Sequence, residues 1–337
     1  MAIRKGSTLI LETAPGVISY GAVGSKKESE GPLAEGFDQL FPDSTLGEET
    51  WEKAECRLQK EAVRIALEKG KIKSEEIHCL FAGDLLNQCT SSIYGLREVG
   101  APFVGLFGAC STMAESLTMA ALFLEGGFGE KTAAVTSSHF CTAERQFRFP
   151  LEYGGQRTPT SQWTVTGSGA VILGKGSSGP YVRGVTIGRM RDMGITDANN
   201  MGAAMAPAAA DTLERFFTDT GMQPEQFDLI ATGDLGKVGS DLLLEVLEKD
   251  GWSLAGRHND CGLMIYDREK QQVEAGGSGC GCSASVLCAH ILPALQRGEL
   301  KEVLFVATGA LMSTTAVQQG ESIPGIAHLV WLTAGAG

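Results

Sequence analysis

Short apolar runs of strand length alternate along this chain with longer segments in which apolar residues recur at helical spacing. Strands are predicted over 132–138 and 302–308, where β-branched and other apolar residues are bounded by turn residues. A helix precedes each of them, from about Cys110 to Leu124 and from about Cys282 to Leu295. This alternation predicts βαβ units and mostly parallel sheets.

The order of these elements occurs twice. Residues 56–85 and 207–235 each read as a helix, a short turn and a strand that ends in Gly-Asp-Leu. A second pair of helices begins at Gly108-Ala-Cys-Ser111 and at Cys280-Gly-Cys-Ser283. Because the flanking elements repeat as well as the short strings, we infer that one α/β half has been duplicated.

The two halves are expected to cover residues 1–175 and 176–337, with a turn-rich joint at 174–180. Two segments lack a counterpart in the other half and are interpreted as insertions, at about 19–43 and 140–163. Long insertions on a repeated scaffold usually form lids or subunit contacts.

Composition narrows the class of protein. The chain has 337 residues, 43% of them hydrophobic, with 44 glycines, which is typical of a tightly packed α/β protein with a large core. Its net charge is -12 and its Lys and Arg residues form no long cluster, so no nucleic-acid footprint is predicted. No apolar run is long enough for a membrane span and no signal peptide is predicted, so a reducing cytosol is expected.

The nine cysteines are an odd number, which argues against a disulfide framework. Cys280 and Cys282 have no second Cys/His pair at zinc-finger spacing, so neither a metal site nor a cofactor is predicted.

The most informative local pattern is a strand-to-helix turn at Cys110. A strand over 103–107, whose apolar pattern predicts a buried position, runs into Gly108-Ala109, whose small size permits a sharp turn. A cysteine at a helix N-terminus meets unpaired N–H groups and the positive end of the dipole, which lower a thiol pKa and attract anions. Such a turn can activate a nucleophile for acyl transfer, or it can hold a carboxylate without any chemistry.

Duplicated α/β halves with Gly-x-Cys-Ser-Thr before an apolar helix resemble the thiolase and ketoacyl-synthase superfamily. Finer motifs, among them 145–153, 156–160 and 192–200, resemble the stage V sporulation protein AD family over nearly the whole chain. The resemblance implies a duplicated five-layer αβαβα sandwich with mixed, mostly parallel sheets, and a homodimer formed through the first-half sheet.

The same resemblance implies a function. That family is implicated in moving dipicolinic acid into the developing spore and is thought to bind it. We therefore expect a non-catalytic protein that binds dipicolinic acid, free or with calcium, for uptake into the forespore. It would sit on the cytoplasmic side of the forespore inner membrane, attached to membrane-embedded channel proteins.

Superfamily enzymes pair the cysteine with histidine or asparagine side chains, and the matching positions here hold other residues. The resemblance puts Ser278 in the place of one histidine, Thr232 in the place of another and Cys280 near the expected asparagine. His139 is a candidate ligand contact and His258 is expected in a solvated loop. The other three histidines, His78, His290 and His328, are interpreted as structural.

The predicted ligand-binding set combines the turn, His139 with two arginines of the 140–163 insertion, and second-half positions: Cys110, Ser111, His139, Arg145, Arg148, Ser278, Cys280 and Gly309. Arg157 is a further candidate partner for a carboxylate. Asp84 and Asp234 are expected to cap turns, with calcium ligation as the alternative. Two other functions stay open: an acyltransferase that uses Cys110 with His139 or His258 as base, and a structural partner with a vestigial pocket.

Overall fold

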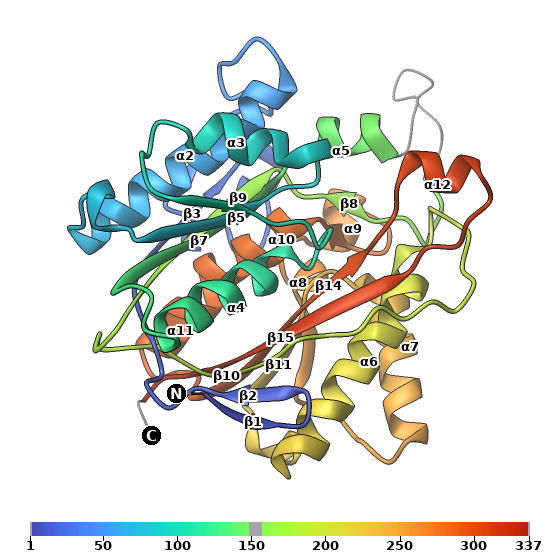
Figure 1. Cartoon of the computed structure of the whole chain (residues 1–337). Helices are drawn as coiled ribbons and strands as arrows, with labels where there is room; N and C mark the ends of the chain where they lie inside the picture. Colours follow the sequence, from blue (N-terminus) through green and yellow to red (C-terminus); the bar gives the residue numbers. More distant parts are fainter. Residues whose placement is uncertain (1, 148–156, 336–337) are drawn as a thin grey trace.

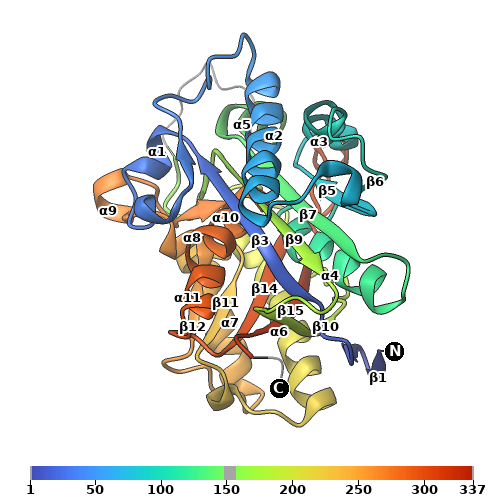
Figure 2. The same ribbon diagram turned by 90° about the vertical axis from the view of Figure 1, so that its left-hand side faces the viewer.

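The computed structural model describes residues 2–147 and 157–335. Within this part, two sheets each carry helices on their outer face, and a further layer of helices lies between them (Figures 1 and 2). The duplicated five-layer α/β arrangement expected from the sequence is thereby confirmed.

The first-half sheet has the strand order β3-β9-β7-β5-β6. β9 runs antiparallel to β3 and β7, whereas β7, β5 and β6 run parallel to one another, so β9 alone of these named strands is reversed. The bounds are Gly16–Gly24 for β3, Gly167–Gly174 for β9, Lys131–Ser138 for β7, Cys79–Gly83 for β5 and Phe103–Gly105 for β6.

The second-half sheet repeats this plan in the order β10-β15-β14-β11-β12, with β15 as the reversed strand. The bounds are Tyr181–Thr186 for β10, Gly325–Thr333 for β15, Glu302–Ala310 for β14, Leu229–Thr232 for β11 and His258–Asp260 for β12. The sheets touch where Tyr181 pairs with Gly16. The identical order and direction are what a duplicated half requires.

Three helical layers enclose the sheets. α2 (Trp51–Gly70) and α3 (Thr90–Leu96) lie outside the first sheet, and α6 (Met201–Thr220) and α7 (Gly236–Lys249) lie outside the second (Figure 2). The middle layer holds α4 (Thr112–Glu125) and a continuous helical segment made of α10 (Cys280–Val286), η6 (Leu287–Ile291) and α11 (Leu292–Gln296). α4 is apolar on most sides because it packs on strands of both sheets.

Shorter elements connect these layers: β1 (Ile3–Lys5), β2 (Thr8–Ile10), α1 (Lys26–Ser29), η1 (Ala34–Gly36), β4 (Gln39–Leu40), η2 (Ser74–Glu76), η3 (Asn87–Cys89), α5 (Phe140–Phe147), β8 (Trp163–Thr164), η5 (Pro224–Gln226), α8 (Cys261–Met264), α9 (Arg268–Gln271), β13 (Gly277–Ser278) and α12 (Thr314–Gln318). The helices and strands predicted at 110–124, 132–138, 282–295 and 302–308 are confirmed to within about two residues.

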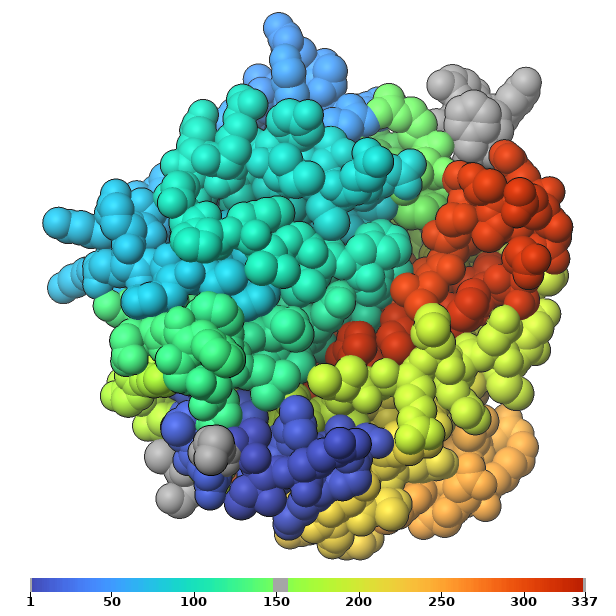
Figure 3. All heavy atoms as spheres, in the orientation of Figure 1, coloured from blue at the N-terminus to red at the C-terminus, as the bar shows by residue number. Residues whose placement is uncertain are grey.

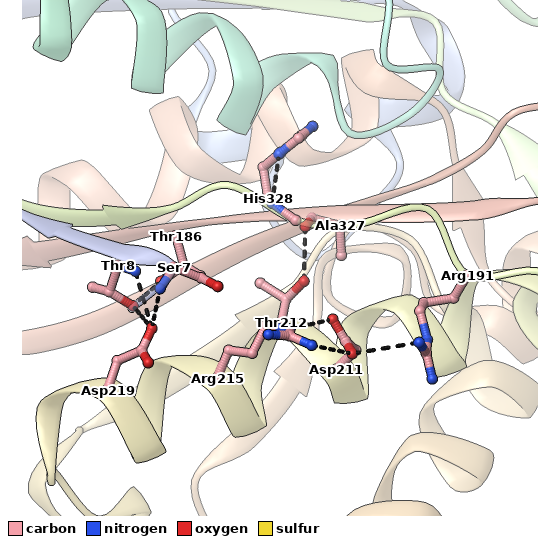
Figure 4. A network of polar contacts seen from close by, with 11 residues as sticks. Ser7, Thr8, Thr186, Arg191, Asp211, Thr212, Arg215, Asp219, Ala327 and His328 are labelled. Atoms are coloured by element: carbon pink, nitrogen blue, oxygen red, sulfur yellow. Dashed lines mark hydrogen bonds and ion pairs between the residues drawn. The ribbon is translucent and has the colours of Figure 1, made fainter. Parts of the chain in front are cut away.

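The outer helix α6 is fastened to its sheet by side chains (Figure 4). The Asp219 carboxylate accepts hydrogen bonds from the backbone N–H groups of Ser7 and Thr8 at 2.7 and 3.0 Å. The Thr212 hydroxyl donates to the Ala327 carbonyl of β15 at 2.9 Å. These contacts hold the N-terminal hairpin and the second sheet against one helix.

The structure corrects two expectations from the sequence. The first insertion was placed from residue 19, but residues 19–24 belong to β3, whose counterpart is β10. Gly21 weakens the strand pattern in the sequence. A glycine is needed there because α2 packs so closely that a Cβ would lie 2.5 Å from the Ala62 carbonyl oxygen. The strand at Phe103 was predicted to be buried, yet β6 is an edge strand and its Phe103 and Val104 side chains are exposed.

Candidate functional site

Cys110 sits on a strained turn at the start of α4. The preceding residue, Ala109, has a φ of 51°, a left-handed conformation that costs a non-glycine residue free energy. The Thr112 hydroxyl donates to the Ala109 carbonyl at 2.6 Å, and the Ser111 hydroxyl donates to the Gly108 carbonyl at 2.7 Å. The turn is therefore held rigidly, and Ser111 serves it instead of facing a ligand.

Strand β14 presses against this turn. A Cβ at Gly309 would lie 2.4 Å from the Gly108 carbonyl oxygen and 3.2 Å from the Cys110 nitrogen. Only glycine permits this approach, so Gly309 brings the second half of the chain into contact with the cysteine of the first half.

A narrow pocket lies over Cys110. It encloses about 420 Å³ of empty space including its mouth, yet the centre of a water molecule can occupy only about 30 Å³ of it. Both halves line it, together with α5 and β8: Leu85, Ala109, Cys110, Ala143, Glu144, Phe147, Thr164, Met201, Ser278, Ala310 and Met312. The lining is mostly apolar with a few polar groups, which is the usual character of a small-molecule site.

The partner of Cys110 in this pocket is an acid. After burial, the nearby Asp234 carboxylate is the main electrostatic influence on the Cys110 thiol. Asp234 accepts from the Ser278 hydroxyl at 3.1 Å, the Gly279 backbone N–H at 2.9 Å and the Thr308 hydroxyl at 2.9 Å. The carboxylate therefore joins segments of the second half near the cysteine.

This environment keeps the thiol protonated. Burial, followed by the negative charge of Asp234, raises the pKa of Cys110 well above its ordinary value. A cysteine nucleophile needs its thiolate, which a neighbouring cation stabilises and a neighbouring carboxylate disfavours. The geometry around Cys110 thus opposes the activation that the helix N-terminus alone would favour.

The two histidines considered as relocated bases lie elsewhere. The His139 ring uses both nitrogens on the backbone: Nε2 is 2.7 Å from the Ser44 carbonyl oxygen, and Nδ1 accepts from the Cys141 N–H at 3.1 Å. His139 is fully buried and does not line the pocket, so the structure does not support its expected ligand contact.

His258 was expected in a solvated loop, and this was wrong. It begins β12, where its Nε2 lies 2.9 Å from the Thr232 hydroxyl, and burial lowers the pKa of His258 to about 4. Thr232 in turn donates to Asp260 at 2.7 Å. The residue that approaches Cys110 after β11 is therefore Asp234, two positions beyond the position inferred from the sequence.

The three arginines considered as carboxylate partners differ in their position relative to the pocket. Arg145 forms an ion pair with Glu52 and lies over the Trp51 ring, outside the lining of the Cys110 pocket. Arg148 lies outside the described residues. Arg157 instead reaches the rim: its guanidinium is 3.5 Å from the Glu144 carboxylate, which lines the pocket.

Ser278 and Cys280 both lie at the site, in different roles. Ser278 lines the pocket. Cys280 packs beneath it in a small buried cluster with Leu85, Cys110 and Ala143, and its thiol donates to the Ser137 carbonyl at 2.9 Å. Among the residues that the structure describes, no group of three His, Cys, Asp or Glu side chains is arranged to hold a metal ion.

The comparisons with known proteins decide the family. A family model described as Stage V sporulation protein AD matches residues 5–333. Stage V sporulation protein AD of Bacillus subtilis (strain 168) is 45% identical over 328 residues, which cover 97% of this chain and 97% of that protein.

The chain belongs to the stage V sporulation protein AD (SpoVAD) family. Its place is therefore in sporulation, and the resemblance seen in the sequence motifs is confirmed. No helix in the described part of this SpoVAD-family chain is both long enough and apolar enough to span a bilayer.

Solved structures show the fold that the SpoVAD-family chain shares with condensing enzymes. It is similar to cerulenin-bound OleA of Xanthomonas campestri (TM-score 0.60, 16% identity, 98% of this chain and 100% of that one). It is also similar to 3-oxoacyl-[acyl-carrier-protein] synthase III of Aquifex aeolicus VF5 (TM-score 0.57, 13% identity, 95% and 100%). At these identities the likeness concerns the thiolase-like fold alone.

Proposed function

We propose that this SpoVAD-family chain is a non-catalytic binding protein for dipicolinic acid, free or as its calcium complex, and serves its uptake into the forespore. The observation that carries the proposal is the Cys110–Asp234 pair inside a closed, mostly apolar pocket. A protonated thiol beside a carboxylate suits holding a small ligand and opposes attacking one.

The pocket suits a flat aromatic molecule. Its narrowness favours a planar ring, which the side chains of Leu85, Phe147 and Met312 would contact. Ser278 and Thr164 supply hydroxyl groups, and the N-termini of α4 and α10 converge from the two halves and favour negative charge. These groups would receive the carboxylates of the ligand.

A cation would help the ligand enter an acidic site. The lining holds Glu144 and adjoins Asp234, and the described lining includes neither lysine nor arginine. Calcium binds oxygen donors and would offset the charge of the two ligand carboxylates. The Arg157–Glu144 pair at the rim offers a second means, because the guanidinium can exchange one carboxylate partner for another.

The expected homodimer also finds support. Exposed apolar side chains gather on and beside the edge strand β6, with Phe103 and Val104 39% exposed and Phe107 47% exposed. Figure 3 shows this face, on which the teal segment around 93–107 lies at the surface. Two copies that pair their β6 edges would bury these side chains.

The proposal also includes a location and protein partners. We place the protein on the cytoplasmic side of the forespore inner membrane, attached through membrane-embedded spore channel proteins. With a net charge of -12, attachment to an anionic lipid surface by charge alone is disfavoured, which supports a protein partner.

Calorimetry tests the proposed ligand. Dipicolinate should bind at least about tenfold more tightly than benzoate, since one carboxylate and its contacts are worth about 1.4 kcal/mol or more. Cys110→Met, which adds volume to the pocket floor, should abolish binding, whereas Cys141→Met outside the lining should not. Equal affinity for benzoate, or unchanged binding by Cys110→Met in a variant that unfolds at the normal temperature, would refute the assignment.

A second candidate rests on the retained cysteine at a strained turn. An acyltransferase would need the Cys110 sulfur to attack a thioester and accept its acyl group. The Cys110 proton would pass to a base, and the thiol of the thioester donor would leave. Intact-mass spectrometry after incubation with acyl-CoA thioesters would then show acyl mass on Cys110. The non-catalytic proposal predicts no adduct.

A further inference from the structure

Three buried carboxyl groups surround the floor of the pocket. Glu55 of α2, Asp84 after β5 and Asp234 after β11 are each fully inaccessible to solvent. Cys280 lies among them and interacts electrostatically with all three, as well as with Cys110. We call Glu55, Asp84 and Asp234 the acid set.

The acid set is held by neutral donors. Glu55 accepts from the Ser137 hydroxyl at 3.0 Å and the Thr142 hydroxyl at 2.7 Å. Asp84 accepts from the Leu86 N–H at 2.9 Å, and from the Ser92 N–H and hydroxyl at 2.8 and 2.7 Å. Within residues 2–147 and 157–335, no lysine, arginine or histidine forms a hydrogen bond or an ion pair with these carboxyl groups.

Charged and titratable groups on the packed elements do not offset this. From α5, Arg145 is engaged with Glu52 and Glu144 with Arg157. The other titratable groups that act on the acid set are thiols or acids. They are Cys56 on α2, Cys89 at the end of η3, Cys261 on α8, Cys280 and Cys282 on α10, and Asp260 beside Asp234. Arg97 at the end of α3 acts on Cys56, on the outer side of α2.

Burial accordingly sets the protonation of the acid set. Burial first, and the neighbouring Asp84 second, raise the pKa of Glu55 to about 8. Burial also raises the pKa of Asp84 and of Asp234 above their ordinary values. At neutral pH the interior therefore already holds protons that water-exposed carboxylates would have released.

Each member of the acid set is joined to a wall of the pocket. Asp84 precedes the lining residue Leu85, and Asp234 accepts from the lining residue Ser278. Glu55 holds Thr142, which precedes the lining residue Ala143. A negative charge placed in the pocket is thus separated from each carboxyl group by one lining residue or its neighbour, and all three carboxyl groups are buried from solvent.

We propose that anion binding in the Cys110 pocket is coupled to proton uptake by Glu55, Asp84 and Asp234, so that a dicarboxylate enters together with protons. The inference rests on the proposed function and adds its regulation. An incoming anion disfavours the ionised acids and raises their proton affinity. The bound state then carries more protons than the free state, and the affinity for the anion falls as pH rises.

The direction of the Glu55 pKa shift determines the pH range in which ligand binding takes up a proton. The pKa of Glu55 is about 8 in the free protein and is higher with the anion bound, so Glu55 takes up a proton on binding mainly above pH 8. Below that pH Glu55 is already protonated, and the affinity changes less with pH. Uptake of about half to one proton corresponds to an affinity that falls about three- to tenfold from pH 8 to pH 9.

Calorimetry of the full chain with dipicolinate at pH 8.5, in two buffers of different ionisation enthalpy, measures the protons taken up. The wild type should take up about half to one proton per ligand, and Glu55→Gln should take up clearly fewer while binding at pH 6.5 within about twofold of wild type. Glu125→Gln, which removes a buried carboxylate that caps Glu12 and Thr13 instead, is the matched control and should behave as wild type.

The outcomes separate the two proposals. Binding with no proton uptake, or with equal uptake by wild type and Glu55→Gln, overturns the coupling and leaves the binding function standing. Absence of dipicolinate binding at every pH overturns both.

Discussion

The Asp234 carboxylate of the second half acts electrostatically on the Cys110 thiol of the first half, and its negative charge disfavours the thiolate. Asp234 is itself fixed by the Ser278 and Thr308 hydroxyl groups, which shows that its position is built into the fold. The thiolase-like fold is present here, and the surroundings of Cys110 favour the neutral thiol.

Removing the negative charge of Asp234 should make the Cys110 thiol more reactive. Asp234→Asn keeps the shape of the side chain but removes the negative charge that helps to raise the pKa of Cys110. We expect alkylation of Cys110 by a small reagent at pH 8 to become about tenfold faster, the equivalent of one pKa unit. Mass spectrometry of the Cys110 peptide measures the rate; the same rate in both proteins would contradict the account of the thiol.

Glu55 should lower the stability of the folded protein as pH rises. The pKa of Glu55 is raised to about 8 in the fold, so the folded state holds a proton that the unfolded chain releases above its ordinary value of 4.5. Stability from this group is complete below pH 4.5 and is lost as pH rises through 8. Glu55→Gln should therefore gain up to about 3 kcal/mol at pH 8 and little at pH 4.5.

Urea unfolding at both pH values measures this difference. A gain that is equal at pH 4.5 and pH 8 would mean that better packing, and not the titration of Glu55, is responsible.

The two described arginines of the α5–β8 region should differ in their effect on ligand binding. Arg157→Ala removes the guanidinium that contacts Glu144 at the pocket rim, and we expect dipicolinate affinity to fall about tenfold, as for a charge-assisted contact. Arg145→Ala, whose guanidinium pairs with Glu52 away from the lining, should bind within about twofold of wild type. Titration calorimetry decides, and a larger loss for Arg145→Ala would show that the ligand lies elsewhere.

The dimer proposal predicts a monomer when β6 is charged. Phe103→Asp would place a carboxylate in the paired edge, and sedimentation velocity should show a dissociation constant raised at least about a hundredfold. Leu242→Asp on the outer helix α7, which is also exposed, is the control and should remain dimeric. A dimer that survives Phe103→Asp must use another surface.

Much of the fold could be predicted because the repeat constrains it. Regular elements such as α4 and β14 carry long apolar patterns whose type does not depend on their neighbours. Strand β3 was missed in part because its glycines reflect close packing by α2, which is a tertiary cause that no local pattern reveals.

The site was predictable in its centre and less so in its surroundings. Cys110 and Ser278 were found because the elbow and the glycine-rich segment before α10 are local motifs. Asp234 was interpreted as a turn cap, because only the folded structure shows that its carboxylate accepts from Gly279 and Thr308 and acts on the thiol. His139 and Arg145 were misplaced because their partners, the Ser44 carbonyl and Glu52, are distant in sequence.

The central claim is that this pocket holds dipicolinate without reacting with it, and a crystal structure of the protein soaked with dipicolinate tests it most directly. The account predicts planar density over Cys110, between Phe147 and Ser278, with no bond to the sulfur. Density for the ligand at another place, or continuous density joining it to the Cys110 sulfur, would contradict it.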